Sequence, residues 1–388
     1  MVTMKKVLII SQYYPPDLTA AAFRIGELAK YLSKTNRFYV EVLTTYPHKT
    51  NANYEIKELE KVKVNRLKIN SDGHLKQYYE FLRKAKAKIK ELKNYDWIFI
   101  TTPPIFIYSL KKYFSKNTRI FLDVRDLWPD TPVAAGKLKK NMIYRFFKIY
   151  EKKMYKNVDY ISVVSKPMSN YLEGKIGRKN SKIIVAYNGV LEEDLNKFPQ
   201  KIFSKREITN FNIVYAGNIG LLQGLEIVFE SFNLLEKLPV HFTFIGEGVL
   251  KNTLYNKSIP YKEKISFISP MEREMLINYL INNAHLMFLN LKQNEILEKT
   301  IPSKVFDYLL VSKPVISGIK GEGKEMLQQT GGCVNFDNQS KYSLYEAVKY
   351  SIENYDELAK NAYDNMKNVL KDYTREKSFE KISKILSS

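Results

Sequence analysis

A lysine and an aspartate stand three residues apart in the segment TIPSKVFDYLL (300–310), where a proline and a serine precede an apolar run. The pattern predicts a helix, which Thr300 could cap and whose first turn suits Pro302, because a missing N–H costs nothing there. Free N–H groups at such a helix end attract anions, and Lys304 would add a positive charge. Lys304 and Asp307 could instead pair with each other on the surface. The sequence leaves both possibilities open.

Glycine-bearing loops follow two β-rich runs in the same half of the chain, in YAGNIGLLQGLE (215–226) and FIGEGVLKNTL (244–254). Glycines after a strand can keep a loop open for a ligand, although each one alone is equally well explained by a turn. Several such loops near the helix of 302–311 favour a ligand site in this half. The first strand is followed by SQYYPPDLTAAAF, which lacks G-x-G-x-x-G and so argues against a nicotinamide site.

Charged residues after strands in the first half form a second group of candidates. The segment DVRDLWPD (123–130) contains Asp123, Arg125 and Asp126. Asp126 could act on a ligand at this strand end, and the alternative is a loop or cap aspartate. His48 follows another strand and could line a cleft. The four histidines lack metal-ligand spacing and no Asp-x-Asp metal motif is evident, so we expect no metal.

The positive charge is concentrated in one half of the chain. Of 62 Lys+Arg and 41 Asp+Glu in 388 residues, residues 1–197 contain 38 and 19, whereas residues 198–388 contain 24 and 22. A basic surface seeks an anionic partner, either a nucleic acid or an anionic lipid, although a lysine-rich composition could also arise from a biased genome. The sequence shows no zinc-finger spacing or RNA-binding aromatic motif, so we expect no nucleic-acid partner. The single cysteine, Cys333, fits a reducing compartment.

Strand-like and helix-like segments alternate along the whole chain, which predicts two α/β domains with parallel sheets. A polar stretch at 192–210 is the expected hinge, and a ligand should bind at the carboxyl ends of the strands. Strands are expected to begin near residues 5, 38, 62, 97, 119, 159, 182, 211, 240, 264, 285 and 313. Helices are expected at 20–34, 75–94, 139–156, 166–175, 222–236, 271–282, 302–311 and 341–372.

The two glycine loops, YNGV (187–190) and PSKVFDYLLVSKPVI (302–316) together resemble glycosyltransferase family 4. QYYPPD (12–17) and LDVRDLWPD (122–130) are similar to segments of bacterial surface-polysaccharide enzymes that include N-acetyl-L-fucosamine transferases. The resemblance implies the GT-B fold, with two facing Rossmann-like domains and a central cleft. It implies an acceptor domain at 1–197, a nucleotide-sugar domain at 198–372, and a helix at 373–388 that returns to the first domain.

The resemblance also implies a reaction. The chain would transfer an N-acetylated amino sugar, with retention of configuration, from a UDP-sugar to a lipid-linked saccharide in capsule or O-antigen synthesis. A donor phosphate oxygen would help to remove the acceptor proton during front-face attack. The nucleotide-sugar is a substrate, and no cofactor is expected. The protein would lie in the cytoplasm, peripherally at the inner face of the cell membrane.

The resemblance assigns roles to particular residues. Lys304 and Asp126 are the expected catalytic residues, and Asp126 would orient or deprotonate the acceptor. Donor contacts are expected from Gly217, Asn218, Gln223, Gly246, Glu247, Ser303, Lys304 and Asp307. Acceptor or cleft contacts are expected from Asp17, Arg24, His48, Asp123, Arg125 and Glu298.

Two departures from the family pattern matter for these roles. Lys299 stands where the family has the first glutamate of a Glu-x7-Glu pair that ends at Asp307, so Glu295 or Glu298 could take its place. Asn218 and Gln223 occupy the glycine loop where many members have Arg and Lys. Neutralisation of phosphate would therefore depend on Lys304, with Arg24 or Arg125 as possible contributors.

The helix expected at 139–156 is amphipathic and basic. Ile143, Phe146, Phe147, Tyr150 and Met154 share one face, with seven Lys/Arg around them: Lys139, Lys140, Arg145, Lys148, Lys152, Lys153 and Lys156. Such a helix could lie in an anionic membrane surface or pack on its own sheet. Two rival functions remain at this stage, a nucleotide-sugar 2-epimerase-like enzyme and a non-enzymatic basic nucleic-acid-binding protein.

Overall fold

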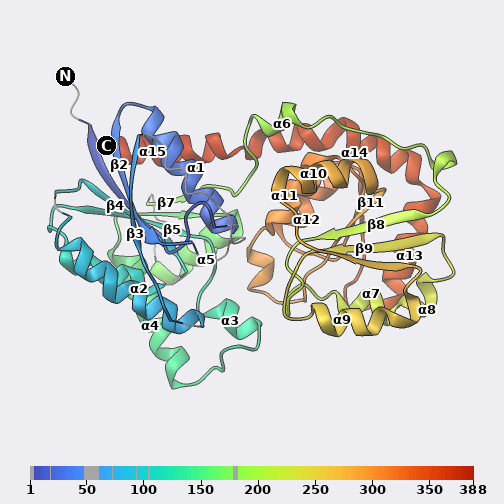
Figure 1. Cartoon of the computed structure of the whole chain (residues 1–388), viewed down its shortest axis with the longest axis horizontal. Helices are drawn as coiled ribbons and strands as arrows, with labels where there is room; N and C mark the ends of the chain where they lie inside the picture. The colour runs from blue at the N-terminus through green and yellow to red at the C-terminus, as the bar shows by residue number, and fades with distance from the viewer. Residues whose placement is uncertain are drawn as a thin grey trace. The chain divides into compact units, whose positions relative to one another are not determined.

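The computed structural model describes residues 4–17, 19–47, 61–71, 73–92, 94–103, 105–177 and 182–388, so His48 lies outside the described residues. The chain divides into two compact units (Figure 1). The first unit comprises the described parts of Met1–Asp130, Leu138–Tyr187 and Glu376–Ser388, and the second comprises Thr131–Lys137 and Asn188–Arg375. The chain therefore changes unit after Tyr187 rather than after residue 197, and its final helix belongs to the first unit.

The first unit contains a parallel sheet in the order β3-β2-β1-β4-β5-β6-β7. Its strands are β1 (Lys5–Ile10), β2 (Phe38–Thr45), β3 (Val62–Leu67), β4 (Trp97–Thr102), β5 (Arg119–Val124), β6 (Tyr160–Val163) and β7 (Ile183–Val185). The central strands are apolar on both faces because helices cover both. All seven strands begin close to the predicted positions.

Helices of the first unit surround this sheet. They are α1 (Ala20–Lys34), α2 (His74–Ile89), α4 (Met142–Asn157), α5 (Lys166–Ile176) and α15 (Arg375–Ser387), with α3 (Asp130–Ala134) where the units meet in sequence. Ile25 and Leu28 of α1 join Phe379 and Ile382 of α15 in one buried cluster on the sheet. The last residues of the chain thus complete the core that its first strand begins.

The second unit has a parallel sheet in the order β10-β9-β8-β11-β12-β13. The strands are β8 (Phe211–Ala216), β9 (Val240–Ile245), β10 (Ile265–Ile268), β11 (Leu286–Leu289), β12 (Val315–Ser317) and β13 (Cys333–Asn335). The direction of winding reverses between β8 and β11, and a crevice forms at such a point in a doubly wound sheet. Both parallel sheets confirm the predicted α/β class.

The second unit's helices are α6 (Asp194–Lys197), α7 (Glu226–Glu230), α8 (Phe232–Leu235), α9 (Lys251–Ser258), α10 (Arg273–Asn283), α11 (Ser303–Val311), α12 (Glu322–Gln328), α13 (Lys341–Glu353) and α14 (Tyr355–Leu370). Two predicted helices are each split, at Ser231 and at Asn354. In this unit the prediction missed β13, α6, α9 and α12, all of which are short. Among the described residues, no helix is long and apolar enough to cross a membrane.

Candidate functional site

Helix α11 is fixed at the winding reversal of the second sheet by one tyrosine. The hydroxyl of Tyr308 accepts the backbone N–H of Ala216 at 3.0 Å and donates to the carbonyl of Phe288 at 3.1 Å. Those two residues belong to the ends of β8 and β11, so the hydroxyl joins the strands on either side of the reversal. The first turn of α11 consequently lies at the carboxyl ends of these strands.

The N-terminus of α11 has free backbone donors. Pro302 is the N-cap, and within the continuous described range 182–388 no side chain caps this helix. The hydroxyl of Thr300 instead donates to the carbonyl of Leu297 at 2.9 Å, so the prediction that Thr300 caps α11 is wrong. The N–H groups of Ser303 and Lys304 have no intrahelical acceptor, as at any helix start, and can bind an anion.

Lys304 lies in a partly buried position beside the loop after β8. Its Nζ is 5.1 Å from the centroid of the Tyr215 ring, and a Cβ on Gly217 would lie 2.4 Å from its Cε. A Cβ at position 217 would displace this end of the lysine side chain. Burial lowers the pKa of Lys304 to about 8, although the charge of Asp307 acts in the opposite direction. An anion bound at the helix end would restore favourable surroundings for the ammonium.

Asp307 pairs with an arginine rather than with Lys304. Its Oδ1 is 3.6 Å from the guanidinium of Arg273, which is also 2.8 Å from the buried carboxylate of Asp194. Burial raises the pKa of Asp307, while Arg273 and Arg375 act to lower it. In the described part of the chain Lys304 and Asp307 form no ion pair, which contradicts the surface-pair alternative.

The glycines of the two loops serve mainly to pack one loop on the other. A Cβ on Gly246 would lie 2.0 Å from the carbonyl oxygen of Gly217, and one on Gly248 would lie 2.2 Å from that of Ile219. The N–H of Ile219 also donates to the carbonyl of Glu247 at 2.8 Å. Gly217, Gly246 and Gly248 all have positive φ, at 134°, 146° and 159°. Their first role is therefore to let two backbones approach, a role that the loop prediction did not include.

The polar side chains of these loops are placed unevenly. Asn218 donates to Gln223 at 3.4 Å, and both residues line a pocket together with Gly220. The carboxylate of Glu247 is exposed and pairs with Lys251 in the next helical turn. Asn218 and Gln223 thus remain available to a donor, whereas Glu247 already has a partner.

Arg24 and Asp123 form a buried ion pair inside the first unit. The guanidinium donates to both carboxylate oxygens, at 3.1 and 2.9 Å, and to the carbonyls of Ala186 and Tyr187 at 3.1 Å each. Burial by itself would raise the pKa of Asp123, but Arg24 holds it below the ordinary value. Arg24 and Asp123 therefore join α1, β5 and the segment that follows β7, and the expectation that they contact a ligand stays a prediction.

The other first-unit candidates lie near this pair. Nε of Arg125 donates to the hydroxyl of Thr101 at 2.8 Å, which ties the residue after β5 to the end of β4. Asp17 is fully buried in the loop after β1. Asp126 is half-buried, and its carbonyl accepts the N–H of Trp128. Arg125 and Asp126 thus lie at the carboxyl end of the first sheet, as their position in the sequence indicates.

Helix α4 has one broad apolar side, as predicted, and only part of that side is packed. Phe147 packs on Trp128 at 4.6 Å between ring centroids, Tyr150 packs on Phe106 at 5.6 Å, and Met154 is fully buried. The rest of this side forms an exposed face: Met142 is 79%, Ile143 57%, Phe146 60% and Ile149 70% accessible. The predicted apolar residues of α4 therefore divide into three that pack on the unit, Phe147, Tyr150 and Met154, and two that stay exposed, Ile143 and Phe146.

Lys148 also differs from the basic residues around it. Its Nζ is 2.7 Å from the carboxylate of Asp130 and 3.0 Å from that of the buried Glu151, and Lys175 binds the same Glu151 at 2.8 Å. Tyr144 and Tyr171 donate to Asp130. This network holds α4 to α5, so Lys148 stabilises the unit and is turned away from the exposed face.

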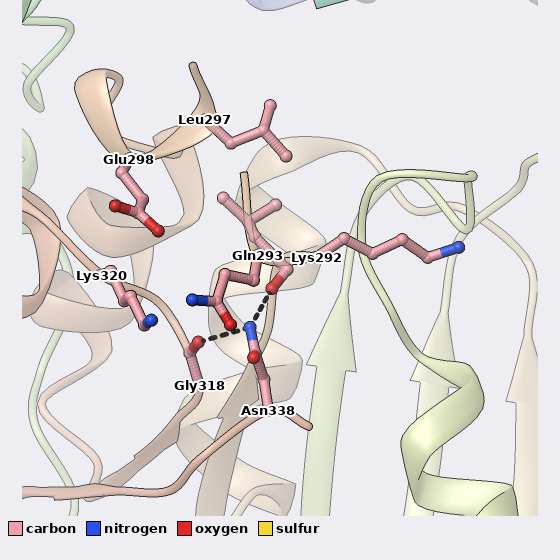
Figure 2. A pocket seen from close by; sticks show the side chains of 8 residues that line it. Lys292, Gln293, Leu297, Glu298, Gly318, Lys320 and Asn338 are labelled. Carbon is pink, nitrogen blue, oxygen red and sulfur yellow. Dashed lines mark hydrogen bonds between the residues drawn. The ribbon is translucent and has the colours of Figure 1, made fainter. Parts of the chain in front are cut away.

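Glu298 lines a second pocket in the second unit, with Gln293, Lys320 and Asn338 (Figure 2). Sequence reasoning singled out Glu298 but missed the other three, together with Tyr308, Arg273 and Asp194. These residues are hard to recognise in the sequence, because each lies in a loop or in an apolar helix whose pattern indicates core packing. In the part of the chain that the structure describes, no group of three or more His, Cys, Asp or Glu side chains could hold a metal ion.

The chain is similar to known proteins in sequence over part of its length and in fold over nearly all of it. Residues 21–193 match the model of Glycosyltransferase Family 4. "Probable glycosyltransferase WbjE" of Pseudomonas aeruginosa is 21% identical over 278 residues, which cover 69% of this chain and 68% of that protein. The structure of Anabaena HepE in complex with UDP and glucose superposes with a TM-score of 0.68, at 14% identity and 99% coverage of both chains.

A further solved structure extends this similarity. WaaG, a glycosyltransferase involved in lipopolysaccharide biosynthesis, gives a TM-score of 0.71 at 12% identity, with 98% of this chain and 99% of that chain covered. At such identities the solved structures establish the fold, which is GT-B. The two parallel sheets described above are the sheets of that fold.

Proposed function

We propose that this chain, whose residues 21–193 match the model of Glycosyltransferase Family 4, is a glycosyltransferase of that type and transfers a sugar from a UDP-sugar to a lipid-linked saccharide during cell-surface polysaccharide synthesis. The observation that carries the proposal is the start of α11. Free backbone N–H groups and a partly desolvated lysine that lacks an ion-pair partner in the range 182–388 converge beside Gly217. Such a helix end suits a diphosphate.

The leaving group of the reaction is a nucleoside diphosphate, whose negative charge grows as the glycosidic bond breaks. Lys304 and the first N–H groups of α11 would stabilise that charge where it develops. We propose transfer with retention, in which a donor phosphate oxygen accepts the proton of the attacking hydroxyl. Asp126 would orient the acceptor, and Asp307, held by Arg273, would accept hydrogen bonds from the ribose hydroxyls.

The identity of the donor follows from two lines of support. HepE was solved with UDP and with UDP-glucose, which favours a uridine nucleotide for a chain of the same fold. The resemblance to N-acetyl-L-fucosamine transferases favours an N-acetylated amino sugar as the transferred group. It also favours capsule or O-antigen synthesis as the setting of the reaction. The nucleotide-sugar is a substrate in this proposal, and neither a cofactor nor a metal takes part.

The acceptor is proposed to be lipid-linked because of the exposed face of α4. Four large apolar side chains there are more than half accessible, and Lys152, Lys153 and Lys156 are exposed on the next turns of the same helix. Apolar side chains beside lysines suit the interface of an anionic membrane, where each nearby cation contributes about 1 kcal/mol. The protein would then bind the cytoplasmic face of the cell membrane peripherally.

The reaction is tested first by donor binding and product analysis. A thermal-shift screen of UDP-, GDP- and dTDP-sugars should show stabilisation by the UDP compounds. Mass analysis with and without a lipid-linked acceptor then separates transfer from epimerisation, since an epimerase would change the donor sugar when no acceptor is present. If no nucleotide-sugar stabilises the protein and it binds nucleic acid in a steeply salt-dependent way, the proposal is refuted.

Membrane binding is tested by flotation with anionic and with neutral liposomes. Ile143→Ser, Phe146→Ser and Ile149→Ser together should reduce binding to anionic vesicles, and so should high salt. Ile259→Ser with Met275→Ser, two exposed apolar residues of the second unit, is the matched control. Equal flotation of both variants, or none for the parent protein, would remove the support for a lipid-linked acceptor.

A further inference from the structure

Arg273 stands where the local structure does not favour a cation. It is the first residue of α10, and a positive charge at a helix N-terminus opposes the helix dipole. Two carboxylates from other helices compensate this charge: the guanidinium lies 2.8 Å from Asp194 of α6 and 3.6 Å from Asp307 of α11. One arginine therefore joins three helices of the second unit, α6, α10 and α11 (Figure 1).

The two carboxylates that contact Arg273 differ in what else they can bind. The side chain of Asp194 is 6% accessible, whereas that of Asp307 is 35% accessible. The contact of 3.6 Å between Asp307 and the guanidinium is too long for a hydrogen bond, and within residues 182–388, all of which are described, the carboxylate of Asp307 accepts none. Asp307 can therefore accept hydrogen bonds from the hydroxyl groups of a ligand, while Asp194 is enclosed by the protein.

The charges around Asp307 favour its ionised form. Burial raises the pKa of this carboxyl group, and the positive charges of Arg273, Arg375 and Lys304 act to lower it. The negative charge of Asp194 acts in the opposite direction. An ionised carboxylate accepts hydrogen bonds at both oxygens, whereas a protonated one uses one oxygen as a donor. Arg273 thus favours the form that can bind two hydroxyl groups.

Both arginines that favour this form are bound to the entry segment, residues 188–197, through which the chain first enters the second unit. Arg273 contacts the segment at Asp194, which lies in the polar stretch expected to be the hinge. Nε of Arg375 donates to the carbonyls of Asn188 and Gly189, at 3.3 and 2.9 Å. The acid that faces a ligand and the segment that enters the unit therefore share the same cations.

We propose that Arg273 is a positioning residue for the donor: it holds the carboxylate of Asp307 toward the ribose, and it transmits the occupancy of that site to the entry segment. When ribose hydroxyls bind Asp307, Arg273 is fixed between two immobile acids, and α6 opens less often. By linkage the reverse also holds, so loss of the Asp194 contact weakens ribose binding. The inference rests on the proposed function, because it needs a nucleotide whose ribose reaches Asp307.

The first test compares UDP with its 2′,3′-dideoxy analogue, which lacks the hydroxyls that Asp307 would bind. Calorimetry measures both ligands with the parent, Arg273→Met, the double variant Arg273→Met with Asp194→Asn, and Lys197→Met. The parent should prefer UDP by about tenfold or more, the effect of hydrogen bonds to a charged group, and both Arg273 variants should reduce this preference at least about threefold.

Two of these variants are controls for folding. Arg273→Met leaves the buried carboxylate of Asp194 without its cation, and the double variant removes that charge as well, so the preference can be measured even if the single variant unfolds. Lys197→Met removes an exposed contact, 2.6 Å from Glu274, between the same helices α6 and α10, and it should keep the preference of the parent.

A pH profile separates positioning from a merely structural role. Without Arg273 the pKa of Asp307 should rise, so the preference for UDP over the analogue should disappear at a higher pH than in the parent as the pH falls from about 7 to about 5. Titration of Lys304 does not change this ratio, because both ligands carry the same diphosphate.

Hydrogen exchange followed by mass spectrometry tests the transmission. Saturating UDP should slow exchange of the backbone amides of the entry segment in the parent and in Lys197→Met. The dideoxy analogue should not slow it, and neither should UDP with Arg273→Met. Equal protection by both ligands would overturn the transmission, since the segment would then respond to the diphosphate or the base.

The affinities also separate the inference from the proposed function. If the Arg273 variants keep the preference and the pH profile of the parent, the inference is overturned and the proposed function stands. If the parent binds UDP and its analogue equally, Asp307 does not bind the ribose, and the inference fails together with that role. If UDP does not bind the parent, the proposed donor fails and the inference fails with it.

Discussion

Replacing Lys304 by methionine removes the ammonium and keeps most of the apolar stem beside Gly217 and Tyr215. The fold should survive, because burial already disfavours the charge, as the lowered pKa of about 8 shows. The lost interaction is one charged donor aimed at a leaving diphosphate. Removal of such a donor costs on the order of 10²–10³ in rate, or about 3–4 kcal/mol of transition-state stabilisation.

The same lysine should make donor binding depend on pH. Below about pH 8 Lys304 carries its charge in the free protein, and above that pH it progressively loses the proton. Affinity for UDP should therefore fall between pH 7 and pH 9.5, and Lys304→Met should show a weaker affinity that no longer changes across this window. Bound diphosphate favours the ammonium and raises its pKa. Lys304 should therefore lose its proton at a higher pH in the complex than in the free protein.

The assay combines initial rates of sugar transfer with calorimetric UDP titrations at pH 7 and pH 9.5. Lys360→Met, an exposed lysine of α14 in the same unit, is the control, and thermal unfolding followed by circular dichroism verifies the fold of each variant. Transfer by Lys304→Met within a few fold of the parent would refute the reasoning. The reasoning would also be refuted if UDP affinity depended on pH in Lys304→Met as it does in the parent, since Lys304 would then be a solvated charge.

Three further changes test other parts of the structure. Arg24→Met leaves the carboxylate of Asp123 buried without its partner, so urea unfolding should show a loss of about 3–5 kcal/mol in stability; a loss below 1 kcal/mol would contradict the buried pair. Burial lowers the pKa of Lys313 to about 7, so the unfolded chain binds more protons than the folded one between about pH 7 and 10, and stability rises with pH there. Lys313→Met should flatten that rise in melting temperature, and an identical profile would argue against burial of the charge. Asp126→Asn should lower the rate of sugar transfer without weakening UDP affinity. A large loss of UDP affinity would mean that Asp126 acts on the donor and not on the acceptor.

Much of the fold is visible in the sequence because it depends on local patterns. Strands buried on both faces read as continuous apolar runs, as in WIFITT at β4 and KVLII at β1. Helices of 15 or 16 residues, such as α1 and α4, repeat their pattern often enough to be recognised. The three-residue strand β13 and the short helices α9 and α12 do not repeat it often enough, and they were missed.

The candidate site also has some features that the sequence indicates and others that only the fold decides. The sequence alone indicates a helix that starts near Pro302 with Lys304 in its first turn, and loops rich in glycine after β8 and β9. Local spacing could not show that Thr300 turns back to Leu297, or that Asp307 prefers Arg273 to the lysine three residues away. Those choices depend on which segments the fold brings alongside.

The tertiary structure decides the role of each charged group, because burial and partners come from residues distant in sequence. Arg24 and Asp123 are 99 residues apart, and only the packing of α1 against the sheet brings them together as a buried pair. Helix α4 has one broad apolar side, and its sequence cannot tell which residues of that side meet Trp128 and which stay exposed. The sequence therefore determines the elements and the chemistry that they carry. Packing determines which of those groups remain free to bind, because a polar side chain that has been buried with a partner is no longer available to a ligand.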